Sequence, residues 1–221
     1  MARPAEAKRV IFIPWPRVDG AQFHDAKLLY VANSNNTAAE KQVQVGHGLT
    51  QFANDSEQWR ADRPAKISHV KYYDGTPDGI IAGLSAFDVV YVQGHGLGGH
   101  PRLLPTSNGE ADEGLRYGDV CERLIQSGLQ QSWNGDLKFN VCESADRGSS
   151  GQRPFAALCS EYLHTREYRC KVWGYSGSVD RRPFDTHRTA QVGDRTYRAK
   201  EKRFGFINGR LIEESGGCTL V

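Results

Sequence analysis

The chain lacks several features that define common classes of protein. None of its five cysteines forms a Cys-x-x-Cys pair, so the spacings of zinc ribbons and thioredoxin-like redox sites are missing. No apolar run approaches the length that crosses a membrane. The glycine-rich run 94–99 lacks both a Walker Lys-Ser/Thr and the full dinucleotide spacing. The net charge is only +2, which argues against a general nucleic-acid binder.

The two ends of the chain carry no strong targeting signal. Only four apolar residues, 10–13, stand before Pro14 and Pro16, which is too short for the core of a signal peptide. Cys218 gives the C-terminal tail the outline of a prenylation box, but valine is not a usual last residue there. Because none of the five cysteines forms a Cys-x-x-Cys pair, we expect free thiols in a reducing compartment. The protein is expected in the cytoplasm, or delivered into a host cytosol without a cleaved signal peptide.

The order of apolar and helix-forming segments predicts an α/β fold. The chain has 221 residues, 38% hydrophobic and 24% charged, which suits a single domain over 1–221. This pattern indicates a mainly parallel central sheet flanked by helices. Strands are expected at 10–13, 67–73, 87–93, 137–141 and 170–175. Helices are expected over 37–55, after the turn at 74–77, over 117–131 and from Pro154.

The segment after Gly177 has a different composition and predicts a C-terminal β-hairpin flap over 178–212. A turn at 192–194 and the Asn208-Gly209 pair are typical of hairpins. Basic groups gathered on one surface suit a polyphosphate. A solvated basic hairpin explains the same composition equally well, so both interpretations stay open. The segment 181–203 has three acidic residues and eight basic ones: Arg181, Arg182, Arg188, Arg195, Arg198, Lys200, Lys202 and Arg203.

Two of the expected strands end on reactive side chains. The strand at 87–93 leads to His95 and Gly96, and the strand at 137–141 leads to Cys142, 47 residues after the histidine. In neighbouring parallel strands, both side chains would emerge at the carboxyl edge of one sheet, where open α/β sheets bind ligands. A thiol beside an imidazole forms a nucleophile with its proton-transfer partner.

The residues around this pair suit acyl chemistry. The backbone N–H groups of Gly96 and Cys142 would together hold a developing oxyanion. Glycine at 96 also lets a substrate backbone approach closely. The plainer alternative is that Cys142 is a small buried hydrophobe, which is common for a free cysteine. The 47-residue separation between Cys142 and the strand-end pair His95-Gly96 favours the catalytic interpretation.

The other histidines and cysteines have simpler explanations. His47 lies in a second Gly-His-Gly run, which follows a helix-like segment rather than a strand. His100 shares the 21-residue loop 94–114 with His95, and a loop of that length is usually functional or mobile. The remaining internal cysteines occupy apolar positions and are expected to pack in the core: Cys121, Cys159 and Cys170.

The strand–His-Gly and strand–Cys pair resembles the caspase-like cysteine peptidases: caspases, legumains, gingipains and the self-processing protease domains of bacterial RTX toxins. The caspase pentapeptide is absent, and Cys142-Glu-Ser is similar to legumain. The layout after Cys142 is most similar to the toxin domain. It has a helix with Pro154-Phe-Ala-Ala, a strand ending in Gly174-Tyr-Ser-Gly177, and then a basic, hairpin-rich segment. The resemblance covers roughly 67–210 and is one of pattern more than identity.

The resemblance implies a cysteine endopeptidase that cleaves a protein substrate, which in the toxin domains is the protein itself. His95 and Cys142 would be the dyad, and the amides of Gly96 and Cys142 the oxyanion hole. The basic flap would bind inositol hexakisphosphate as an allosteric activator, while the chemistry itself would need no cofactor or metal. The expected partners are a protein or peptide substrate and an inositol polyphosphate, with no nucleic acid and no transmembrane segment.

Two other classes of function fit the same residues. The chain can be a non-enzymatic member of the same fold that binds a phosphorylated or acidic partner through its basic flap. It can also keep the cysteine nucleophile and act as an acyltransferase or deamidase. The substrate is not specified by the sequence, and the candidate specificity regions are 175–180 and 97–114.

Overall fold

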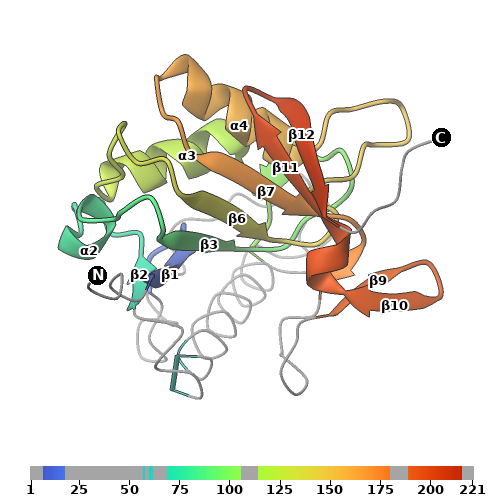
Figure 1. Ribbon diagram of the computed structural model, residues 1–221, viewed down its shortest axis with the longest axis horizontal. Helices are drawn as coiled ribbons and strands as arrows, with labels where there is room; N and C mark the ends of the chain where they lie inside the picture. The colour runs from blue at the N-terminus through green and yellow to red at the C-terminus, as the bar shows by residue number, and fades with distance from the viewer. Residues whose placement is uncertain are drawn as a thin grey trace, which may run out of the picture.

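The centre of the molecule is a mixed, mostly parallel sheet of seven strands, in the order β12-β11-β7-β6-β3-β1-β2 (Figure 1). The computed structural model describes residues 7–17, 57, 60–61, 69–105, 114–179 and 189–215. The chain is therefore α/β, as the sequence predicts. The expected helix over 37–55, His47 and Cys218 lie outside the described residues.

Five parallel strands make up most of this sheet, and each lies within two residues of its expected position. Four of them bury apolar residues at their centres, as is usual for parallel strands, whereas the strand at 69–72 buries only Lys71. Phe87, which the sequence placed in a strand, precedes β3 and is 75% exposed. The five are β1 (Arg9–Ile13), β2 (His69–Tyr72), β3 (Val89–Gln93), β6 (Asp136–Asn140) and β7 (Lys171–Tyr175).

Helices α3 (Tyr117–Gln126) and α4 (Phe155–Thr165) lie side by side and cover one face of the sheet (Figure 1). The ring of Phe155 meets that of Phe139 on β6 edge to face, with centroids 5.2 Å apart. Helix α3 ends earlier than the periodicity predicts. The chain turns there because Gly128 adopts a φ of 109°, which a residue with a side chain rarely does.

The segment expected as a flap is divided between two sheets. β8 (Ser178–Val179), β9 (Thr189–Val192) and β10 (Arg195–Arg198) form a small antiparallel sheet. The 3-10 helix η2 (Ala199–Lys202) then leads back to the main sheet. There β11 (Arg203–Ile207) pairs antiparallel with β7, and β12 (Arg210–Ser215) forms the edge. Only the β8–β10 sheet is therefore separate from the central sheet.

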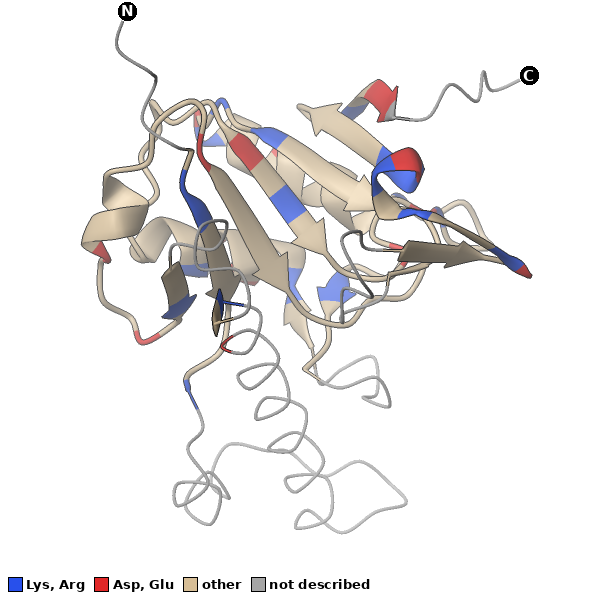
Figure 2. Cartoon of the chain, turned by 60° about the horizontal axis from the view of Figure 1, so that its bottom comes forward, with Lys and Arg blue, Asp and Glu red and all other residues tan. Residues whose placement is uncertain are grey.

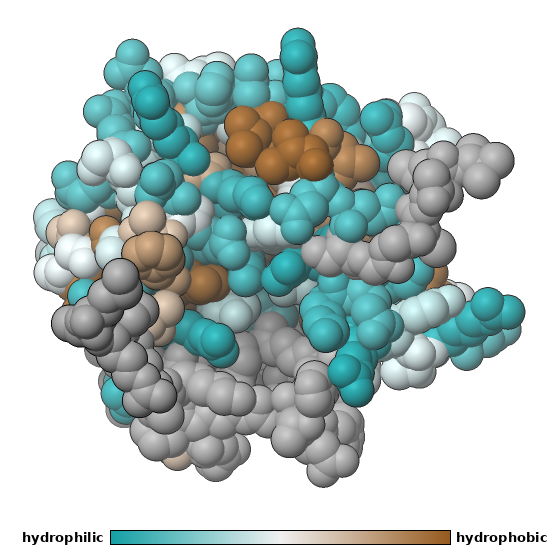
Figure 3. All heavy atoms as spheres, in the orientation of Figure 1, coloured by the Kyte–Doolittle hydropathy of each residue, from teal (hydrophilic) through white to brown (hydrophobic). Residues whose placement is uncertain are grey.

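Other short elements complete the fold. Within the expected loop 94–114, β4 (Arg102–Leu103) pairs with β5 (Leu115–Arg116). The face of the molecule seen in Figure 3 carries an apolar patch over the β11–β12 hairpin, where three large side chains are exposed: Ile207, Leu211 and Ile212. Within the described ranges, no helix is long and apolar enough to cross a membrane.

The short helix α2 (Gly79–Ala82) begins at a capped residue. The Asp78 carboxylate accepts hydrogen bonds from the Ile80 N–H (2.9 Å) and the Ile81 N–H (3.1 Å), and it lies 3.0 Å from His69 Nε2. Burial alone would raise the pKa of Asp78. The hydrogen bonds from Ile81, His69 and Ile80 outweigh it and lower this pKa below its ordinary value.

We predict that Asp78→Ala lowers the free energy of unfolding by about 1 kcal/mol at pH 7, because two helix N–H groups lose their acceptor. A lowered folded-state pKa means that the contribution is present above the unfolded pKa of about 3.9 and is lost as the pH falls below it. Urea unfolding of both proteins at pH 7 and at pH 3 tests this. An equal difference at the two pH values would contradict it.

Candidate active site

The parallel pairing of β3 and β6 determines where His95 and Cys142 lie. The register runs from Val89↔Asp136 to Gln93↔Asn140, and both site residues follow the last pair by two positions. His95 and Cys142 therefore each lie just beyond the end of one of two adjacent parallel strands. The neighbouring strand ends inferred from the sequence are therefore present at the carboxyl edge of the sheet.

A buried pair of amide side chains joins the two strands one pleat before this point. Asn140 Nδ2 donates to Gln93 Oε1 at 2.6 Å, and the two residues are only 4% and 6% exposed. A buried hydrogen bond of this kind is costly to break, because either partner alone would be left unsatisfied. Sequence reasoning missed this pair, although it has the same 47-residue separation as His95 and Cys142.

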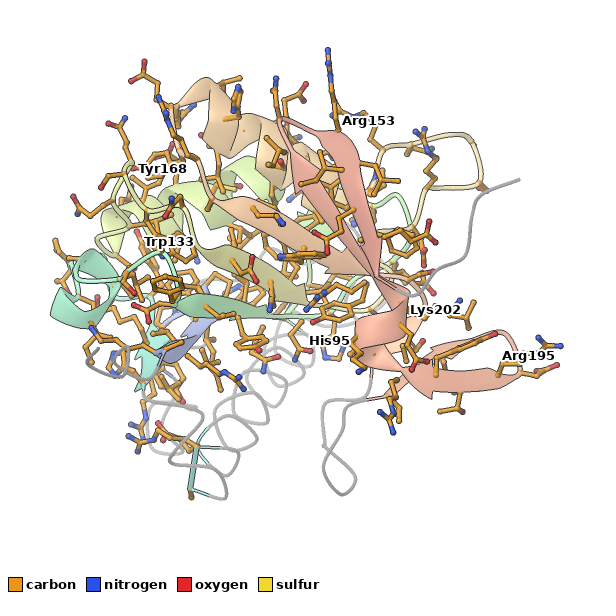
Figure 4. All side chains as sticks on the ribbon, viewed as in Figure 1. His95, Trp133, Arg153, Tyr168, Arg195 and Lys202 are labelled. Atoms are coloured by element: carbon orange, nitrogen blue, oxygen red, sulfur yellow. The ribbon has the colours of Figure 1, made fainter. Side chains whose placement is uncertain are left out.

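The backbone of His95 is fixed from the opposite side. It forms a two-way bridge with Leu104, with N···O distances of 2.9 Å and 2.8 Å. His95 is 8% exposed and lies beyond the end of the central strands, on the side of the sheet where η2 carries Lys202 (Figure 4). His100 shares the same loop, and its Nδ1 is 3.4 Å from the carbonyl of Arg102.

Gly96 is required by the close approach of the two chains. A Cβ at this position would lie 2.4 Å from the carbonyl oxygen of Cys142 and 2.5 Å from Val141 Cγ1. The sequence analysis attributed this glycine to the approach of a substrate, whereas here it makes room for the cysteine backbone itself. Among the described residues, the N–H groups of Gly96 and Cys142 donate no hydrogen bond.

The turn after Cys142 is tied to the end of β7. Glu143 adopts a φ of 54°, which is uncommon for a residue with a side chain. Three hydrogen bonds hold the turn. The Glu143 N–H donates to the Gly177 carbonyl (2.8 Å), and the Ala145 N–H donates to the Tyr175 carbonyl (3.0 Å). The Tyr175 N–H donates to Ser144 Oγ (3.0 Å). These bonds fix the backbone that presents the thiol.

Two carboxylates hold this turn between the loops on either side of it. Glu143 Oε2 accepts from the Gly98 N–H of the histidine loop at 2.7 Å. Asp146 Oδ2 accepts from the Gly177 N–H, between β7 and β8, at 2.8 Å. Sequence reasoning did not identify Glu143 and Asp146 as part of the site, since their acceptor roles depend on loops distant in the chain.

Cys142 differs from the other described cysteines in its surroundings. It is half-buried, and its Sγ accepts a hydrogen bond from the Val179 N–H at 3.3 Å. The other three are buried in the core, as the sequence predicts: Cys121, Cys159 and Cys170. Burial raises the pKa of Cys159 well above its ordinary value and that of Cys170 to about 12. Those two thiols stay neutral and shielded at physiological pH, and Cys142 is the candidate nucleophile among the cysteines that the structure describes.

The described basic residues of the flap lie on several elements. Figure 4 shows Arg195 at the tip of the β9–β10 hairpin and Lys202 on η2. Lys202 Nζ packs 4.1 Å above the ring of Tyr197, and Arg203 stacks at 4.1 Å on Trp173 of the central sheet. Acidic residues alternate with basic ones along the chain at the hairpin tip and on η2 (Figure 2). Arg198 and Lys200, two further basic residues of the flap, are exposed. Three basic residues of the flap lie outside the described residues: Arg181, Arg182 and Arg188.

Comparison with models of protein families and with curated proteins found no match to this chain. Within the described part of the chain, no group of three or more His, Cys, Asp and Glu side chains is arranged to hold a metal ion. A functional assignment therefore depends on the geometry at the ends of β3 and β6.

We predict that Gly96→Ala destabilises the protein by about 1–3 kcal/mol and impairs any chemistry at Cys142, because the added methyl group overlaps the cysteine carbonyl. Gly79→Ala is the matched control, since nothing lies within 4 Å of a Cβ there. In helix α2, alanine is expected to be neutral or stabilising by up to about 1 kcal/mol. Chemical denaturation measures both, and equal effects of the two substitutions would contradict the close packing at Gly96.

Proposed function

We propose that the chain is a caspase-like cysteine peptidase, with Cys142 as nucleophile and His95 as proton donor and acceptor. The observation that carries this proposal is the register of β3 and β6. It sets a histidine and a half-buried cysteine at equivalent positions beyond two adjacent strand ends, with Gly96 packed on the Cys142 carbonyl. The step from thiol chemistry to peptide cleavage is supported by the resemblance in Cys142-Glu-Ser and in the layout that follows it.

The proposed reaction begins at Cys142. Its thiolate attacks the carbonyl carbon of the scissile peptide bond, and the N–H groups of Gly96 and Cys142 stabilise the negative oxygen of the tetrahedral intermediate. His95 donates a proton to the leaving amine as the C–N bond breaks, which leaves an acyl-enzyme. Water then attacks the thioester and gives a proton to His95, and release of the acid product restores the Cys142 thiolate and the protonated His95.

Two features of the surroundings suit this mechanism. Neither proposed oxyanion donor has another acceptor among the described residues. The strained turn at Glu143 and its bonds to Gly177 hold the Cys142 backbone in place, and such preorganisation is the main source of electrostatic stabilisation in acyl transfer. The candidate specificity regions, 175–179 and 97–105, lie on the two sides of the cysteine turn.

Covalent labelling tests the proposed nucleophile. We predict that a peptidyl acyloxymethyl ketone modifies Cys142, that Cys142→Ala abolishes labelling, and that His95→Ala lowers peptide cleavage by about 10²–10⁴-fold. Peptide mapping by mass spectrometry locates the label. His164→Ala, in the exposed last turn of α4, is the control and should behave as the unmodified protein.

The outcomes of this experiment separate the competing functions. Labelling or cleavage that survives both Cys142→Ala and His95→Ala would overturn the peptidase proposal. A Cys142-dependent acyl-enzyme that passes its acyl group to an added amine, without cleaving any peptide, would indicate the acyltransferase alternative. Failure of every electrophile to react would favour a non-enzymatic binding module.

We also propose that an inositol polyphosphate regulates this site through the basic residues of the β9–β10 hairpin and η2. Arg195, Arg198 and Lys200 are exposed there. β9 pairs with β8, whose Val179 contacts Cys142 Sγ, so a ligand that orders the hairpin acts close to the nucleophile.

A thermal melt with inositol hexakisphosphate tests the regulator. At a concentration about 100-fold above its Kd, the ligand should stabilise by about 2.7 kcal/mol and raise Tm by roughly 5 °C or more. Combined Arg198→Glu and Lys200→Glu substitutions should remove the shift. Arg210→Glu, at an exposed site on β12, should keep it. An unchanged Tm with excess ligand would count against the proposal.

A further inference from the structure

The sulfur of Cys142 is in contact with both main-chain groups of one residue. The Val179 N–H donates to Sγ at 3.3 Å, and the thiol lies 3.8 Å from the Val179 carbonyl oxygen, within donor range for sulfur. Val179 is 37 residues further along the chain and is 6% exposed. The nucleophile is thus held by a group outside its own strand and loop.

Strand geometry explains why this N–H is available. β8 is an edge of the small sheet, in the order β10-β9-β8, and Val179 lies opposite Ala190 on β9. Successive residues direct their N–H and C=O groups to opposite edges of a strand. Ser178 therefore faces Gln191 on β9, while Val179 turns both groups away from β9 and towards Cys142.

The two contacts serve the two protonation states of the cysteine. A neutral thiol can donate its proton to the carbonyl, whereas the thiolate can only accept. A hydrogen bond donated to the charged form favours that form, and bonds to charged groups are stronger than bonds between neutral ones. We propose that the Val179 N–H is a catalytic group, which holds the Cys142 thiolate and acts beside His95 in preparing the nucleophile. This inference rests on the proposed role of Cys142 as nucleophile.

The position of this donor depends on the small sheet. Val179 packs with Tyr175, Ala190 and Ala199 in a cluster separate from the main core. Tyr175 ends β7 and is bonded to the cysteine turn, while Ala199 begins η2. The hydrogen bond to sulfur is therefore formed only when β8, β9 and η2 are packed together. The reactivity of Cys142 should report the order of this sheet.

Proline at 179 removes the donor without removing a bond of the β8–β9 ladder. We expect Val179→Pro to react with iodoacetamide at Cys142 about three- to tenfold more slowly than the unmodified protein at pH 7, because the sulfur loses the hydrogen bond that holds it for attack. Val179→Ala keeps the N–H and is the matched control, expected within about twofold of the unmodified rate. The modified residue is identified by peptide mapping, and thermal melts verify that each variant is folded.

A measurement on the unmodified chain covers the case in which Val179→Pro does not fold. In amide NMR spectra, the Val179 N–H resonance should move when the sulfur is removed by Cys142→Ala. The Ser178 N–H, which faces β9, should stay in place. A Val179 resonance unchanged by Cys142→Ala, or a folded Val179→Pro that is alkylated at the unmodified rate or faster, would overturn the inference. Neither readout needs peptide cleavage, so a chain without peptidase activity would refute the proposed function and leave this test intact.

Discussion

The site depends on one constraint, the parallel register of β3 with β6. Because Gln93 stands opposite Asn140, His95 and Cys142 each follow the last paired residue of their strands by two positions, at the same edge of the sheet. The buried hydrogen bond between the Gln93 and Asn140 side chains reinforces that register on the last pleat before the site. A slip of one residue would turn one of the pair to the opposite face of the sheet and separate them.

Around this register, the backbone does most of the positioning. Gly96 packs on the cysteine carbonyl, the turn at Glu143 is tied to β7, and Val179 reaches the sulfur from a separate small sheet. Three segments distant in sequence therefore meet around Cys142. In the proposed mechanism, the histidine loop and the cysteine turn hold the dyad, and the third segment connects it to a basic hairpin. This arrangement explains how a partner bound at the hairpin would reach the chemistry without touching either member of the dyad.

Much of the fold could be predicted from the sequence, because apolar runs and turn residues are local signals. The five parallel strands, the α3 and α4 helices and the hairpin at Asn208-Gly209 all have such signals. The positions of His95 and Cys142 followed from the same strand patterns. The partners of the site did not: Asp146 binds Gly177 and Val179 binds Cys142 only because loops far apart in the chain meet. The division of the expected flap was also missed, since no local signal shows that β11 joins β7 in the main sheet.

The central claim is that Cys142 and His95 act on one substrate carbonyl. A crystal structure of the protein with a peptide aldehyde tests it most directly. The account predicts a thiohemiacetal bond to Cys142 Sγ, its oxygen within about 3 Å of the Gly96 and Cys142 N–H groups, and the His95 ring on the leaving-group side. An aldehyde bound away from Cys142, or a His95 ring turned away from the adduct, would contradict it.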